Sequence, residues 1–172
     1  MMTFAAILQL LVALAFVSIP LVRHRFGGSA KANAEAELRR QGVPVTVLAE
    51  NKLSFDASGH ETAVPLTVAG VMLVVATLNL LANPWGETLT WVFQSIVLAG
   101  NVLIVYSNLT AAKSVQAAFR RKGDPMLQRI DVRALLKAAE KGFPAWVWVL
   151  QNVRNVVVFA GSALALAAAA VA

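Results

Sequence analysis

Cysteine is absent from this chain of 172 residues, and charged residues are scarce. Without cysteine there is no disulfide, no thiolate metal site and no cysteine nucleophile. Only 14% of the residues are charged, against about 25% in an average soluble domain, whereas 58% are hydrophobic. A water-soluble fold cannot cover its surface with so few charges, and the abundance of apolar residues excludes disorder. The composition therefore predicts an integral membrane protein.

Long runs without charge separate two blocks of charged residues. These runs cover residues 1–22, 62–86, 88–112 and 155–172. About 20 apolar residues in a helix cross a hydrocarbon core about 30 Å thick, so the first three runs are long enough by themselves. The last run is long enough if residues 144–154 begin the same helix. We therefore predict an all-α integral membrane protein, a four-transmembrane-helix bundle with helices over about residues 3–22, 63–83, 88–110 and 144–170.

The segments between these helices carry nearly all of the basic residues. The expected loops, about residues 23–62 and 111–143, hold six and eight Lys or Arg residues, whereas the turn between the second and third helices holds none. Cytoplasmic loops collect Lys and Arg, so we predict two basic cytoplasmic loops and both termini outside. Residues 1–172 are expected to form a single domain in the plasma membrane, of the bacterial inner-membrane type. The first helix is expected to be retained, because basic residues follow its apolar run and do not precede it.

Both basic loops are expected to contain short amphipathic helices. Residues 29–41 have helical character, and residues 43–57 have a β-type composition that predicts a short hairpin. The second loop predicts a helix over residues 125–141, with Asp124 as its cap and Pro125 at its first position. The third membrane helix is expected to continue into this loop before the helix begins.

Basic side chains of the second loop are candidates for contact with lipid headgroups. On the helix predicted over residues 125–141 they recur every four positions on one face, and apolar residues fall on another face, which suits a helix lying in the headgroup layer. The candidates are Arg120, Arg121, Lys122, Arg129, Arg133 and Lys137. The expected partners are the lipid bilayer and anionic lipids at its cytoplasmic face. Nucleic acid is not expected, since aromatic residues do not interleave with this basic sequence.

Arg154 is the only Lys or Arg predicted inside a membrane span, and no Asp or Glu falls inside any span. An arginine at the centre of a membrane helix costs about 2.5–3.5 kcal/mol on insertion scales. Polar residues near it on the same helix and at a similar depth on the third helix complete a candidate polar site. The site consists of Arg154, Gln151, Asn155 and Asn101. It can bind an anion or an amphiphile or contact another subunit; alternatively, Arg154 reaches back to phosphates of the inner leaflet.

Three amides predict a second polar layer in the outer half of the membrane. These are Gln9, Asn79 and Gln94, one on each of the first three helices. Hydrogen bonds between such amides hold membrane helices together, so the expected role is structural. No catalytic set is found, and the two histidines, His24 and His60, have no third ligand at metal spacing. We expect neither a metal nor a cofactor.

Several functions are compatible with this layout. The first hypothesis is a noncatalytic accessory or interaction subunit that binds another membrane protein or a second copy of the chain. Alternatives are a small transporter or channel, a membrane enzyme acting on a lipophilic substrate, and a sensor of the lipid surface. Proton or cation coupling usually needs a carboxylate inside the membrane, and none is predicted. The layout resembles that of the membrane proteins of glutathione and eicosanoid metabolism, but residues 61–65 read Glu-Thr-Ala-Val-Pro in place of their Arg- and Asn-rich signature.

Overall fold

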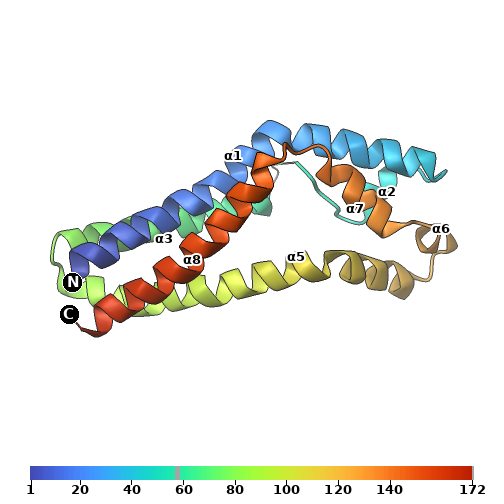
Figure 1. Ribbon diagram of the computed structural model, residues 1–172. Coiled ribbons are helices and arrows are strands. Elements are labelled where there is room, and N and C mark those ends of the chain that lie inside the picture. The colour runs from blue at the N-terminus through green and yellow to red at the C-terminus, as the bar shows by residue number, and fades with distance from the viewer. Residues whose placement is uncertain (57–58, 172) are drawn as a thin grey trace. The chain divides into compact units, whose positions relative to one another are not determined.

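The computed structural model describes residues 1–56 and 59–171 as helices joined by short turns, without a strand in those residues. Four helical stretches are long and apolar enough to cross a membrane: Met2–Arg40, Thr62–Leu80, Pro84–Lys122 and Trp146–Ala170. An all-helical chain with four such stretches confirms the coarse prediction. The elements, labelled in Figure 1, are α1 (Met2–Arg40), α2 (Thr46–Glu50), α3 (His60–Leu80), α4 (Pro84–Leu89), η1 (Thr90–Gln94), α5 (Ser95–Lys122), α6 (Pro125–Gln128), α7 (Val132–Glu140) and α8 (Trp146–Ala170).

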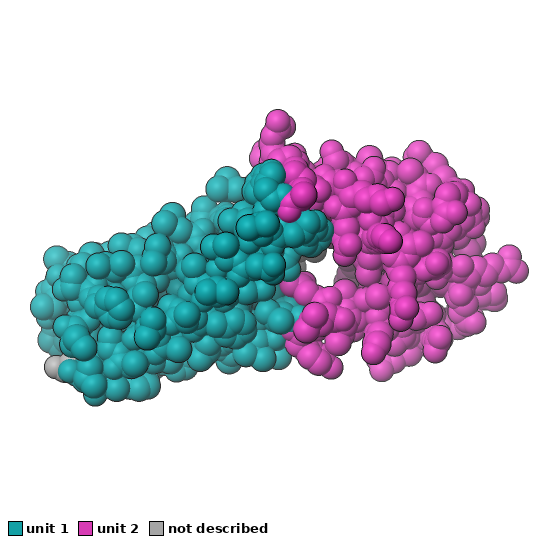
Figure 2. Space-filling model, viewed as in Figure 1, with its two compact units in different colours: residues 1–21, 59–105, 146–172 teal, residues 22–58, 106–145 magenta. Residues whose placement is uncertain are grey.

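The chain forms two compact units (Figure 2). Unit 1 consists of Met1–Leu21, Gly59–Val105 and Trp146–Ala172, and unit 2 consists of Val22–Ser58 and Tyr106–Ala145. Fourteen of the fifteen Lys and Arg residues belong to unit 2. The two segments of unit 2 therefore overlap the two basic loops predicted from the sequence.

The helices of unit 1 expose large apolar side chains and bury polar ones. Leu14 and Leu103 are each 67% exposed, whereas Gln9 is fully buried. Its apolar core joins α1, α3 and α8 through residues such as Val12, Met72 and Val158. Figure 1 shows both termini at the same end of unit 1 as the turn between α3 and α4. This distribution is the reverse of that in a water-soluble domain, where polar side chains cover the surface.

Unit 2 has the opposite distribution, with an apolar core and a charged surface. Its core is built from α1, α2, α5, α6 and α7, and Leu38 and Leu135 at its centre are fully buried. Among the described residues of unit 2, the exposed large hydrophobic side chains are Tyr106 and Leu109, near the start of its second segment, and Met126. Unit 2 therefore has a packed apolar core of its own, which the prediction of two basic loops with short amphipathic helices did not include.

α1 continues without a break where the sequence predicted two separate helices. The helices predicted over residues 3–22 and 29–41 are both part of α1, which also includes Pro20. Gly27 is buried, and a Cβ atom at this position would lie only 2.7 Å from the Cα atom of Asp56. Glycine is needed here for the close approach of a neighbouring segment, so this glycine does not mark a helix end.

The hairpin predicted over residues 43–57 is wrong for the described part of that segment, and its last residue lies outside the described residues. Residues 46–50 form the short helix α2, and residues 51–56 are irregular. Val47 and Leu48 are both buried, whereas adjacent residues in a strand point to opposite faces. Packing both of them into the core of unit 2 therefore favours a helical turn over a strand.

The helix predicted over residues 125–141 is interrupted in its first third. α6 ends at Gln128, and α7 begins only at Val132. The carboxylate of Asp131 accepts a hydrogen bond of 3.0 Å from the backbone N–H of Ala134, and this bond caps α7. Asp131, which falls inside the predicted helix, thus starts a new one.

The turn between α3 and α4 is tighter than predicted. α3 ends at Leu80, not near residue 83, and α4 begins at Pro84, not near residue 88. The side-chain oxygen of Asn83 accepts a hydrogen bond of 3.0 Å from the N–H of Trp85. Asparagine as cap and proline at the first position therefore start a new helix almost as soon as the previous one has ended.

Candidate functional site

Six polar side chains are buried among the residues that the structure describes, and all six belong to unit 1. They are Gln9, Asn79, Thr90, Gln94, Asn101 and Ser162. Four of them, Gln9, Asn79, Gln94 and Asn101, are candidates from the sequence. Burying an amide or a hydroxyl is costly unless it is hydrogen-bonded, so the partners of these groups determine their role.

Gln9, Asn79 and Thr90 form a closed triangle of hydrogen bonds, here called the amide triangle, that joins α1, α3 and η1. The Asn79 Nδ2 atom donates to Gln9 Oε1 at 2.9 Å and to Thr90 Oγ1 at 2.8 Å. The Gln9 Nε2 atom donates to the same hydroxyl at 2.9 Å, and this hydroxyl donates to the Gly86 carbonyl at 2.8 Å. Both amide hydrogens of Asn79 and the hydroxyl hydrogen of Thr90 are used, so the triangle ties three elements together directly.

Gly86 allows α4 to approach the amide triangle. A Cβ atom at this position would overlap the Asn79 side chain, lying 3.2 Å from its Cγ atom and closer still to its Oδ1 atom. Among the described residues this Oδ1 atom has no hydrogen-bond partner. η1 is a single π-helical turn, and both its first residue, Thr90, and its last, Gln94, are buried. The glycine and the π-turn together place the Thr90 hydroxyl within reach of both amides.

Gln94 does not take part in the amide triangle. Its Nε2 atom donates to the Ser162 hydroxyl at 2.8 Å, and this bond joins η1 to α8. The three residues of the predicted outer layer are therefore divided between the amide triangle and the Gln94–Ser162 pair. Both groups consist of direct bonds between helices, the arrangement expected for structural contacts.

The inner candidates Asn101 and Asn155 contain polar atoms without a partner. Asn101 is 2% exposed, and its Nδ2 atom has no hydrogen-bond partner in the described residues. The Oδ1 atom of Asn155 is buried and also has none. Such unpaired buried atoms cost about 1–3 kcal/mol each, so each one requires an explanation.

Arg154 and Gln151 are both partly buried on α8. No described acidic side chain lies within ion-pair distance of the Arg154 guanidinium. Within the described part of the chain, none of Arg154, Gln151, Asn155 and Asn101 donates a hydrogen bond to another of the four. The hydrogen-bond donors and acceptors of these four side chains are therefore not used on one another.

The six basic residues predicted to contact lipid headgroups are all exposed in unit 2. The apolar residues of the same segment are instead internal, since Leu127, Ile130, Leu135 and Ala139 belong to the core of unit 2. The restart of the helix after Asp131 changes which apolar residues are buried. This segment therefore presents its charges to the surroundings and keeps its apolar face inside the unit.

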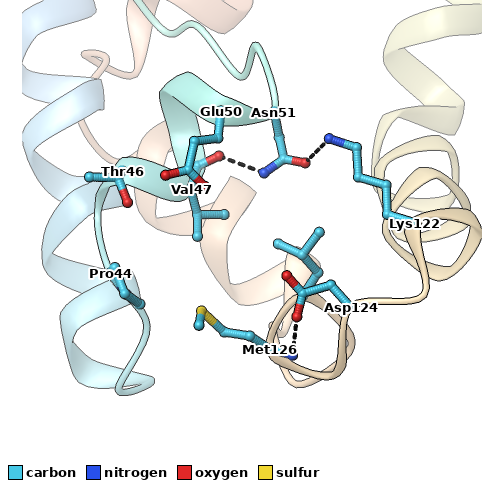
Figure 3. Close-up of a pocket in the computed structure, with 9 residues that line it drawn as sticks. Pro44, Thr46, Val47, Glu50, Asn51, Lys122, Asp124 and Met126 are labelled. Atoms are coloured by element: carbon cyan, nitrogen blue, oxygen red, sulfur yellow. Dashed lines mark hydrogen bonds between the residues drawn. The ribbon is translucent and has the colours of Figure 1, made fainter.

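A cavity of about 550 Å³ opens beside Lys122 in unit 2 (Figure 3). Its lining consists of Pro44, Thr46, Val47, Glu50, Asn51, Lys122, Asp124, Met126 and Leu127. Lys122 Nζ donates to Asn51 Oδ1 at 2.6 Å, and the Asp124 carboxylate accepts from the N–H of Met126 at 2.8 Å. Because its charged groups are of both signs and two of them are already bonded, the cavity favours no single class of ligand.

Hydrogen bonds around Gln41 join the end of α1 to the start of α7. The Gln41 Oε1 atom accepts from the N–H of Asp131 at 2.9 Å, and its Nε2 atom donates to the Glu37 carboxylate at 2.7 Å. Arg40 also donates to Glu37, at 2.6 and 2.8 Å. The hydrogen bonds from Arg40 and Gln41 lower the pKa of Glu37 from its ordinary value of 4.5 to about 2. These contacts are structural, since the bonds between Gln41 and Asp131 join the end of α1 to the start of α7, and those to Glu37 hold Gln41 in place.

In the described residues, no group of three His, Cys, Asp or Glu side chains is arranged to hold a metal ion. Sequence reasoning missed Thr90, Ser162 and Gly86, which complete the contacts of the predicted amides. Thr90 lies four positions before Gln94, and this spacing places the two on one helix face. The close approach at Gly86 has no comparable signal, because it depends on how α4 packs against α3.

No protein-family model, curated protein or solved structure matches this chain.

Proposed function

We propose that this chain is a noncatalytic, multi-pass membrane subunit whose four apolar helices hold a basic unit at the cytoplasmic face of a plasma membrane. In this arrangement the helices of unit 1 span the bilayer as a four-helix bundle, and both termini lie outside. Unit 2 docks on an acidic surface of another membrane protein. This is the accessory or interaction role that was the first hypothesis from the sequence, and it involves both units of the chain.

The division of charge between the two units is the observation that supports this proposal. Unit 2 holds fourteen of the fifteen basic residues and seven of the nine acidic ones, which gives it a formal net charge of +7. Unit 1 exposes apolar side chains and has one basic residue, Arg154. Lipid suits the surface of unit 1, and the excess of Lys and Arg favours the cytoplasmic side for unit 2.

An interaction role is supported by the way unit 2 uses its side chains. The apolar face of α7 is occupied by the core of the unit, whereas Arg129, Arg133 and Lys137 are exposed. A surface of this kind attracts acidic partners by charge and does not insert into lipid. Anionic headgroups, the other partner expected for these side chains, would be attracted by the same charges. An acidic protein surface is favoured because it can also match the rigid shape of a packed unit.

The proposal is tested by purifying the tagged protein from its native membranes in a mild detergent and identifying retained proteins by mass spectrometry. We expect one membrane protein at a stoichiometric ratio, and we expect the triple variant Arg129→Gln, Arg133→Gln, Lys137→Gln to lose it. The matched control, Arg25→Gln, Lys52→Gln, Lys113→Gln, removes the same charge elsewhere on unit 2 and should retain it.

Two results would contradict the accessory role. One is that both triple variants retain the partner protein equally, because binding would then not depend on Arg129, Arg133 and Lys137. The other is solute flux through liposomes that contain only the purified chain, which would favour the transporter alternative.

A further inference from the structure

We infer that Arg154, Asn101 and Asn155 form a binding site between α5 and α8 for an amphiphile whose headgroup carries an anionic oxygen and a hydroxyl. The inference rests on the membrane placement of unit 1 proposed above. It concerns a site within unit 1 and is independent of the partner proposed for unit 2.

The first argument is the register of α5 and α8. The bond between Gln94 and Ser162 fixes which residues of these antiparallel helices lie at the same level. Asn101 follows Gln94 by seven residues, and Asn155 precedes Ser162 by seven. Seven residues are about two helical turns, so both asparagines lie about two turns from this bond and on the same face of their helices as its members. Their unpaired atoms therefore belong to one layer.

The second argument is that the two asparagines do not bond to each other. Figure 1 shows α8 and the first half of α5 diverging from the end of unit 1 where the termini lie. Gln94 and Ser162 bond directly, whereas Asn101 Nδ2 and Asn155 Oδ1 both lack a partner among the described residues. Each asparagine therefore keeps a buried polar atom that a ligand can satisfy.

The third argument is the chemistry of the unused groups. The Arg154 guanidinium and the unpaired Nδ2 atom of Asn101 are hydrogen-bond donors, and the acceptor they match is an anionic oxygen. The free Oδ1 atom of Asn155 accepts and matches a hydroxyl. A phosphodiester with a hydroxylated headgroup supplies both kinds of group. The site therefore selects for charge and for a hydroxyl at the same time.

The fourth argument is the apolar surface beside the site. Val153 and Val156 flank Arg154 and Asn155 on α8 and are 51% and 65% exposed. Arg154 is the ninth residue of its helix, about 12 Å from the start of α8. A headgroup at this layer can thus keep its acyl chains in contact with exposed valines, which favours an amphiphile over a soluble anion.

The experiment measures the association of spin-labelled lipids with the purified protein in phosphatidylcholine liposomes. Phosphatidylglycerol has the anionic oxygen and the hydroxyl, and phosphatidylcholine is the neutral reference. We measure the motionally restricted fraction of each lipid in about 1 M salt, where screening over about 3 Å suppresses the contribution of surface charges. The wild-type protein should prefer phosphatidylglycerol about tenfold, the effect of one charge-assisted contact.

Arg154→Gln should remove this preference, and Asn101→Leu should weaken it several-fold. Neither change adds a charge in the apolar layer, and a melting curve of each variant verifies that it is folded. The control variant Arg129→Gln, Arg133→Gln, Lys137→Gln should keep the preference. Competition by glycerol phosphate in solution would contradict an amphiphile as the ligand and assign the site to a soluble anion.

An unchanged preference in folded Arg154→Gln would overturn the inference and leave Arg154 as a side chain that reaches the phosphates of the inner leaflet. The absence of a restricted fraction for either lipid would contradict the membrane placement itself. The two failures are therefore distinguishable in one experiment.

Discussion

The role of a glycine in this chain depends on which atoms a side chain at its position would contact. Gly27 and Gly28 are adjacent on α1, yet only Gly27 is buried against the backbone of Phe55 and Asp56. Gly28 is exposed, and a Cβ atom there would meet no atom within 4 Å. The two glycines therefore differ in function although the sequence presents them as a pair.

Gly27→Ala should destabilise unit 2 by about 1–3 kcal/mol, because the new methyl group would collide with backbone atoms that cannot move away. Gly28→Ala should stabilise the same helix by about 0.5–1 kcal/mol, because alanine loses less backbone entropy on folding. Thermal unfolding in detergent, followed by circular dichroism, measures both variants. Equal effects of the two changes would contradict the close contact at Gly27.

The ionisation of Glu37 predicts how the stability of unit 2 depends on pH. Its pKa falls from 4.5 to about 2 in the folded state, so the unfolded state binds the proton more readily. The contribution of Glu37 to stability is therefore fully present above about pH 5 and is lost as the pH falls through about 2. The difference in melting temperature between the wild type and Glu37→Gln should shrink between pH 5 and pH 2. A difference that grows over this range would contradict the assignment.

Elements of unit 1 are joined by hydrogen bonds that converge on one hydroxyl. Thr90 accepts from Gln9 and Asn79 and donates to the Gly86 carbonyl, so a single side chain connects α1, α3 and the start of the third apolar stretch. The sequence predicted the two amides but not the threonine that joins them. Threonine is common in apolar helices, and its role appears only when neighbouring helices are placed around it.

Thr90→Val keeps the shape of the side chain but removes its hydroxyl, and it should cost about 1–2 kcal/mol because the Gln9 amide loses its acceptor. The matched control is Thr77→Val. Thr77 is exposed, and its hydroxyl only donates to the Leu73 carbonyl of its own helix. The control should change stability by less than about 0.5 kcal/mol. Unfolding of both variants in mixed micelles measures the difference, and equal costs would exclude the amide triangle as a stabilising contact.

Substitutions on α7 test whether its apolar face packs against the core of unit 2 or against lipid. Leu135 is fully buried in the core of unit 2, whereas its neighbour Leu136 is only partly buried. Leu135→Ala should lower the opening free energy of α7 by about 2–5 kcal/mol, and Leu136→Ala should lower it clearly less. Hydrogen exchange of α7 amides in detergent measures this quantity. The reverse order would indicate that α7 turns its other face inward.

The helices with long apolar runs were predictable from the sequence, because length and hydrophobicity alone decide which segments can span a bilayer. The structure of residues 43–56 was not. Val45 and Val47 alternate as in a strand, and only contact with a core built from distant segments makes a helical turn around Val47 more favourable. The cap at Asp124 was predicted from its local sequence, whereas Asn83 was not predicted as a cap and Asp131 lay within a periodic pattern.

At the scale of the whole molecule, the proposed orientation predicts which residues face each side of the membrane. The chain has no cysteine, so single cysteines introduced at Trp85 and Lys137 give unambiguous labelling sites. A membrane-impermeant maleimide added to intact cells should label Trp85→Cys and not Lys137→Cys. Permeabilised cells should show labelling of both. The opposite result would invert the proposed topology, and recovery of the protein without detergent would exclude it.

The core of unit 2 is assembled from parts of the chain that are synthesised far apart in time. Val47 and Leu127 belong to the same core but are separated by 80 residues, which include two of the four long apolar stretches. At about 5–20 residues per second a ribosome needs about 4–16 s to reach the second part after completing the first. During this interval the second half of α1 has its apolar side uncovered. A nascent chain arrested before residue 125 should therefore be the form most readily captured by chaperones and proteases.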